Sequence, residues 1–186
     1  MSIGKRTAAL ACLLLLFSTQ VQAANKLKDR VQGLPNVVNP LPSKWYSGYL
    51  SVTQSKALHY VLVESLNNVT TDPLLLWFNG GPGCSSMEGL FAELGPFIFD
   101  DGENIIKPNP YPWNMNASVL YIESPAGVGF SIANNTDDFK HSDISQSEDL
   151  FAGLQDFFNA FPDMRANEIY ITGESYAGVY VPYLAW

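Results

Sequence analysis

The stretch "EIYITGESYAGVYVPYLAW", residues 168–186, is the most informative part of the sequence for the fold. It begins with an apolar run typical of a strand, reaches Ser175 within a turn of small residues, and continues into a second apolar run. A strand that turns sharply into a helix would present Ser175 at the carboxyl edge of a sheet. Gly173 and Ala177, two positions before and after it, would relieve the crowding. The same pattern is also typical of a simple turn or cap, so a chemical role for Ser175 depends on what else the chain brings to that edge.

Five runs, one of which leads directly into this turn, predict the sheet to which the turn belongs. Three of them are continuous apolar segments, "PLLLWF" at 73–78, "ASVLYIES" at 117–124 and "NEIYIT" at 167–172. They are too short for amphipathic helices, and we expect parallel strands buried on both faces with covering helices between them. The runs at 44–52 and 56–65 alternate aromatic or β-branched residues with polar ones, which predicts a hairpin at the margin of the sheet.

One covering helix is predicted within residues 142–162. Ser145 with Glu148 offers a capping box at its start, and Pro162 closes it. Apolar side chains recur there at helical spacing: Leu150, Phe151, Leu154, Phe157, Phe158 and Phe161. The order strand, helix, strand makes the fold class α/β.

The first residues predict a secreted protein. Residues 1–23 contain Lys5 and Arg6, then a short apolar run, and they end in small residues. This pattern is typical of a signal peptide cleaved after Ala23, and its apolar run is too short for a membrane anchor. Its removal changes the formal charge from −8 to −10, so we expect no nucleic-acid partner. Three glycosylation sequons fit the secretory pathway: Asn68, Asn116 and Asn134.

A second motif supplies what the serine turn needs. In "LLLWFNGGPGCSSMEGLFAELGP", residues 74–96, a predicted strand runs into a glycine-rich loop at 79–83. Glycines allow backbone N–H groups to point together at one oxygen, and α/β-hydrolases place half of the oxyanion hole in such a loop. The other half is the N–H of the residue after the nucleophile, here Tyr176. A tight turn is the alternative for each motif alone, but the two together favour a catalytic site.

These motifs resemble the serine carboxypeptidase family, particularly its lysosomal, cathepsin A-like branch. The resemblance rests on "WFNGGPGCSSMEGLFAELGP" at 77–96, "NPYPWNMNASVLYIESPAGVGFS" at 109–131 and "ITGESYAGVYVPYLA" at 171–185. It implies an α/β-hydrolase fold, with a mostly parallel sheet and helices on both faces. It also implies a lysosomal, vacuolar or extracellular location and the release of single residues from peptide C-termini at acidic pH. The expected partner is a peptide or protein with a free C-terminus, with no cofactor and no metal ion.

The resemblance also implies roles for individual residues. Ser175 would be the nucleophile, and the N–H groups of Gly81 and Tyr176 would hold the oxyanion. The groups that grip the substrate carboxylate would be Asn79, Gly80, Glu93 and Glu174. Two neighbouring carboxylates repel each other, so we expect one glutamate to stay protonated in acid and donate a hydrogen bond to the substrate. Glu93 on a solvated helix face is the alternative.

Two further residues belong to the first of these motifs. Trp77 corresponds to an aromatic residue beside the family's site, although an aromatic in a buried strand is first of all core. Cys84 is the only cysteine after the leader, and the resemblance pairs it with a cysteine that this chain does not contain.

The groups that would activate Ser175 are missing from the expected place. A serine needs a histidine to take its proton, and in α/β-hydrolases that histidine follows the serine in the chain. His59 and His141 both precede Ser175, and we expect each at the surface. We therefore interpret residues 24–186 as the N-terminal portion of a longer enzyme, inactive as a 186-residue chain, with an unpaired apolar strand edge at 168–172. An acyltransferase on the same scaffold and a non-catalytic binding or protective fragment are the alternatives.

Overall fold

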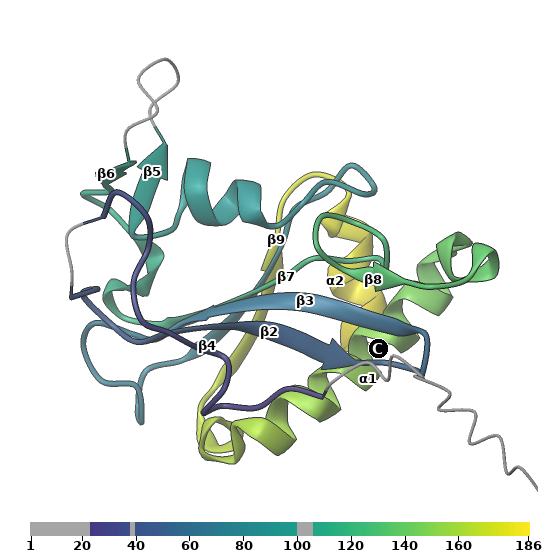
Figure 1. Cartoon of the computed structure of the whole chain (residues 1–186), viewed down its shortest axis with the longest axis horizontal. Coiled ribbons are helices and arrows are strands. Elements are labelled where there is room, and N and C mark those ends of the chain that lie inside the picture. The colour runs from purple at the N-terminus through teal and green to yellow at the C-terminus, as the bar shows by residue number, and fades with distance from the viewer. Residues whose placement is uncertain (1–22, 38–39, 100–105) are drawn as a thin grey trace, which may run out of the picture.

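A mixed β-sheet of seven strands runs through the structure (Figure 1). The computed structural model describes residues 23–37, 40–99 and 106–186, so the predicted leader lies outside the described residues except for Ala23. The strand order is β1-β2-β3-β7-β4-β9, and β8 also pairs with β3. The strands of this sheet are β1 Arg30–Val31, β2 Trp45–Ser51, β3 Lys56–Val63, β4 Leu74–Phe78, β7 Ser118–Ile122, β8 Ile132–Ala133 and β9 Ile169–Gly173. A separate hairpin joins β5 Phe97–Phe99 to β6 Ile106–Pro108.

The three predicted apolar strands are confirmed as β4, β7 and β9. The strand β4 pairs in parallel with both of the others. Its pairing with β7 begins at Leu74↔Ser118, and its pairing with β9 ends at Phe78↔Gly173. Parallel pairing brings the carboxyl ends of these strands, and the loops that follow them, to one edge of the sheet. The strand β9 has β4 as its one neighbour among the described residues. It is therefore half-exposed instead of buried on both faces, and Tyr170 is 51% exposed.

The predicted hairpin is confirmed as β2 and β3, paired antiparallel from Trp45↔Val63 to Ser51↔Ala57. Its second strand lies further inside the sheet than the alternating pattern suggested, because β3 also pairs with β7. The prediction that His59 lies at the surface is wrong. Its position in β3, between two other strands, leaves it only 8% exposed.

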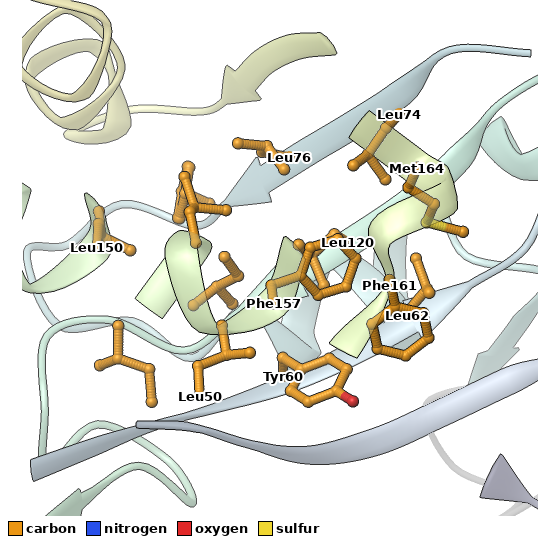
Figure 2. Packing of buried hydrophobic residues seen from close by; sticks show 14 of the residues in the cluster. Leu50, Tyr60, Leu62, Leu74, Leu76, Leu120, Leu150, Phe157, Phe161 and Met164 are labelled. Atoms are coloured by element: carbon orange, nitrogen blue, oxygen red, sulfur yellow. The ribbon is translucent and has the colours of Figure 1, made fainter. Parts of the chain in front are cut away.

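Two α-helices, α1 Asp143–Ala160 and α2 Ala177–Ala185, pack against one face of the sheet (Figure 1). The rings of Phe157 and Phe161 on and just after α1 stack with centroids 4.8 Å apart over Tyr60, Leu62 and Leu120 (Figure 2). The opposite face is covered by the π-helix η1 Gly89–Glu93 and the β5–β6 hairpin. Short 3₁₀ helices complete the fold: η2 Trp113–Met115, η3 Thr136–Phe139 and η4 Pro162–Ala166.

The start of α1 differs from the prediction. The cap is Ser142, whose hydroxyl accepts a hydrogen bond from the N–H of Ser145, while the Ser145 hydroxyl accepts from the N–H of Ser142. The predicted box of Ser145 with Glu148 is wrong by one turn, since Ser145 already lies inside the helix. Pro162 begins η4 directly after the helix, as a helix-ending proline does. No helix in the described parts of the chain combines the length and apolar character needed to cross a bilayer.

Candidate active site

The turn between β9 and α2 places Ser175 at the carboxyl edge of the parallel strands. Ser175 has φ of 54°, one of two described non-glycine residues with a positive φ. A Cβ on Gly173 would lie 2.5 Å from both the Cβ of Ala177 and the carbonyl oxygen of Phe78. Only glycine fits at 173, and only a small residue fits at 177, as the sequence predicted. The serine is exposed at the tip of a strained turn, where an outside group can reach it.

The glycine-rich loop after β4 lies directly against this turn. A Cβ on Gly80 would lie 2.6 Å from the backbone nitrogen of Tyr176 and 2.9 Å from the Cβ of Ser175. Gly81 has φ of 106°, a conformation that L side chains rarely adopt. Within residues 40–99 and 106–186, no acceptor takes a hydrogen bond from the N–H of Gly81 or of Tyr176. Two free backbone donors thus flank the serine, which is the arrangement expected of an oxyanion hole.

The Asn79 side chain joins the two glutamates that sequence analysis singled out. It is 1% exposed, and its Nδ2 donates to Glu93 Oε1 at 2.9 Å and to Glu174 Oε1 at 3.0 Å. Its Oδ1 accepts from Trp77 Nε1 at 2.8 Å and from the N–H of Gly89 at 3.0 Å. These four bonds use both amide hydrogens and both lone pairs, so the orientation of the amide is fixed. The carboxyl groups of Glu93 and Glu174 meet at one buried nitrogen while both residues remain exposed to solvent.

Trp77 has both of the roles left open by the sequence. It is a core residue on the η1 face of the sheet, and Trp113 packs on it edge to face at 5.3 Å. Its ring N–H also orients Asn79. A Cβ on Gly89 would lie 2.1 Å from Trp77 Nε1, so the start of η1 can approach this pair only because residue 89 is glycine.

A buried carboxylate, Glu123, accepts a hydrogen bond from Ser85, just after the glycine-rich loop. The sequence analysis assigned no role to Glu123. It is 0% exposed, accepts hydrogen bonds from the Ser85 hydroxyl and the N–H of Phe130, and its Oε2 lies 2.9 Å from His59 Nδ1. Burial alone raises the pKa of Glu123. The hydrogen bonds from His59, Ser85 and Phe130, with the charge of His59, outweigh burial and hold that pKa below the ordinary value for glutamate. A Cβ on Gly129 would overlap this carboxyl group. The sequence feature that could have indicated Glu123 is an acidic residue directly after a buried strand, followed by Gly127 and Gly129.

Neither histidine is hydrogen bonded to Ser175 in the described structure. His59 lies between Glu123 and Ser47, with its Nε2 3.0 Å from Ser47 Oγ. His141 Nε2 lies 3.0 Å from the carbonyl oxygen of Ala126. Both imidazoles therefore have local partners, and neither is placed as the base for Ser175.

The remaining predicted residues lie at the surface. Cys84 is exposed and has a free thiol. The asparagines of all three sequons are exposed: Asn68, Asn116 and Asn134. Among the residues that the structure describes, no group of three or more His, Cys, Asp or Glu side chains could hold a metal ion.

Comparison with known proteins identifies the family. The family profile described as serine carboxypeptidase matches residues 35–186. The chain is 43% identical to the lysosomal protective protein of Mus musculus, over 98% of this chain and 38% of that protein. It is 49% identical to serine carboxypeptidase ctsa-4.1 of Caenorhabditis elegans, over 84% of this chain and 33% of that protein. The chain thus spans about a third of the length of these relatives.

The fold leads to the same family. The crystal structure of Kex1(delta)p, a prohormone-processing carboxypeptidase from Saccharomyces cerevisiae, superposes with a TM-score of 0.77 at 26% identity. The match covers 87% of this chain and 38% of that chain, so the mixed sheet with its helices is an α/β-hydrolase fold. Sequence and structure agree, and the chain belongs to the serine carboxypeptidase family.

Proposed function

We propose that this chain forms the nucleophile, the oxyanion site and the carboxylate-recognition site of a serine-type carboxypeptidase. The observation that carries the proposal is the pair of hydrogen bonds from the Asn79 amide to Glu93 and to Glu174. Glu174 directly precedes Ser175, so this network lies next to the serine. A peptidase that removes only the last residue must recognise a free carboxylate next to the bond that it cuts. Asn79, the backbone of Gly80 and the two glutamates would supply that recognition beside Ser175.

The chemistry proceeds through an acyl-enzyme. The Ser175 hydroxyl attacks the carbonyl of the last peptide bond, and the oxygen of the tetrahedral intermediate takes hydrogen bonds from the N–H groups of Gly81 and Tyr176. The C-terminal amino acid leaves, and water then hydrolyses the ester on Ser175. The positive φ of Ser175 supports this role, because strained backbone of this kind concentrates at functional sites.

Acidic working conditions follow from the recognition step. Two ionised glutamates would repel the substrate carboxylate, whereas a protonated carboxyl group donates a hydrogen bond to it. We expect kcat/KM for substrates with a free carboxylate to fall as the pH rises towards neutrality. Substitution Glu174→Gln, which can donate at any pH, should flatten that fall. Removal of the charge at a site outside this cluster, Glu148→Gln, should not change it.

The base that activates Ser175 is proposed to come from the part of the longer protein that corresponds to the unmatched length of its relatives. We expect the 186-residue chain alone to show no measurable peptidase activity. The location is proposed to be the secretory pathway, ending in a lysosome, a vacuole or the exterior, with glycans on the exposed sequons.

The test is an assay of the longer protein with a blocked dipeptide at about pH 5, within the acidic range proposed for this enzyme. Release of the free C-terminal amino acid, lost in Ser175→Ala, is the expected result. The matched substrate is the same dipeptide with its carboxylate amidated, which should be cleaved far more slowly. Absence of release together with acyl transfer from a glucose ester would contradict the proposal in favour of an acyltransferase.

A further inference from the structure

The segment that follows Ala23 is held firmly on the hairpin. Asp29 accepts hydrogen bonds from the N–H of Asn25 at 2.8 Å and from the hydroxyl of Tyr60 at 2.8 Å. Its carbonyl oxygen accepts from the N–H of Ser47, also at 2.8 Å. The Asp29 carboxyl group presses on β2 so closely that a Cβ on Gly48 would lie 2.5 Å from it. Residues 24–29 therefore have a defined place against the sheet.

This segment brings the backbone nitrogen of Ala24 to a carboxylate on α1. Ala24 N donates to Asp156 Oδ2 at 3.0 Å, and the N–H of Ser51, at the end of β2, donates to the same oxygen at 2.8 Å. The Ala24 side chain packs against the main core. In Figure 1 the start of the coloured chain accordingly runs beside α1.

The surroundings of Asp156 are negatively charged. No Lys, Arg or His side chain within the described ranges makes a salt bridge with it. The carboxylate of Asp29 and the neutral hydroxyl of Tyr60 lie nearby. Of the two lysines in residues 24–29, Lys26 pairs with Asp163, and Lys28 makes no salt bridge with a described residue. Burial, the hydrogen bond to Asp29 and the negative charges of Asp29 and Asp156 all raise the pKa of Tyr60. A positive charge at Ala24 would offset this cluster of carboxylates.

We propose that cleavage after Ala23, where the predicted leader ends, gives Ala24 an α-ammonium group that forms a salt bridge with Asp156. The step is hydrolysis by a peptidase of the secretory pathway. Water supplies the hydroxyl that makes the Ala23 carboxylate, the C–N bond breaks, and the Ala24 nitrogen takes up protons to become –NH₃⁺. Residues 1–23 have the pattern of a leader that ends at this bond. Processing would replace the hydrogen bond from the neutral Ala24 N–H to Asp156 by an ion pair. The Asp156 carboxylate on α1 would then bind both the new N-terminus and the end of β2.

The first test is the N-terminus of the protein secreted from eukaryotic cells that express the full coding sequence. Mass spectrometry should find Ala24 as the first residue. A different first residue would overturn the proposal.

The second test measures the ion pair in the processed protein. Asp156→Asn keeps an acceptor for both N–H groups but removes the charge, and we expect it to lower the unfolding midpoint by about 2–4 °C. The loss should disappear when the α-amine of Ala24 is acetylated, and above about pH 9.5, where a free α-amine is neutral. Asp163→Asn is the matched control, since it removes a nearby carboxylate that does not contact Ala24. Equal losses in the free and acetylated proteins would refute the ion pair.

A third measurement serves if the Asp156 variant is too unstable to compare. The α-amine of Ala24 in the native protein should react at least several-fold more slowly with an amine-labelling reagent at pH 7 than the same amine after unfolding, because an ion-paired amine stays protonated. Equal rates in both states would contradict the proposal. None of these readouts depends on peptidase activity.

Discussion

The close contact between the glycine-rich loop and the serine turn makes Gly80→Ala the most informative substitution. The new Cβ would lie 2.6 Å from Tyr176 N and 2.8 Å from the carbonyl oxygen of Glu174, whereas ordinary contact begins at 3.4 Å. Both neighbours are backbone atoms, so they cannot rotate away as a side chain would. The loop and the turn must separate by about 0.8 Å.

This separation should affect stability and catalysis in measurable amounts. Overpacking of a tight contact costs about 1–3 kcal/mol, to be measured as the change in the free energy of unfolding in urea. A shift approaching 1 Å between nucleophile and oxyanion donor costs on the order of a hundredfold in kcat/KM, to be measured with a blocked dipeptide in the proposed longer enzyme. The fall should appear in kcat more than in KM, because the oxyanion contacts form in the transition state.

The matched control is Gly178→Ala, three residues after the serine. A Cβ there meets no atom within 4 Å and lies in α2, so this substitution should stabilise the chain by about 0.5–1 kcal/mol and leave activity unchanged. If Gly80→Ala and Gly178→Ala have the same stability and the same kcat/KM, the inferred contact between loop and turn is wrong.

Three other substitutions test the site. Asn79→Ala should lower the free energy of unfolding by about 3 kcal/mol or more, because it leaves the buried N–H groups of Trp77 and Gly89 without their acceptor; an unchanged urea midpoint would argue against the network. Ser175→Gly should abolish activity yet raise the stability by up to about 1 kcal/mol, since glycine adopts the observed φ of 54° without strain, and a loss of stability would show that the turn is unstrained. Glu123→Gln tests the lowered pKa of that carboxyl group: the ionised form stabilises the fold above the ordinary glutamate range, and this contribution is lost as the pH falls through the lowered pKa. The variant should therefore be less stable than the wild type at pH 7, and the difference should shrink as the pH falls below the ordinary glutamate range; a difference that stays constant with pH would contradict this.

Local patterns in the sequence were sufficient for the main strands of the sheet and for α1. The apolar runs that became β4, β7 and β9, the β2–β3 hairpin and the aromatic face of α1 are each encoded within a few neighbouring residues, because burial of one strand or helix face selects its own periodicity. The exact cap of α1 was not predictable, since Ser142, Ser145 and Glu148 offer two competing capping boxes one turn apart. The burial of His59 also depended on a partner strand far along the chain.

The residue types of the candidate site could also be predicted from the sequence, because two glycine-rich motifs follow buried strands. How those residues meet depends on the fold. The Asn79 amide reaches Glu93 and Glu174, 14 and 95 positions away. Ser85, just after the loop that carries Asn79, donates a hydrogen bond to Glu123, which directly follows β7. Parallel pairing of β4 with β7 and β9 produces these meetings, because it brings the carboxyl ends of strands that are distant in sequence to one edge of the sheet.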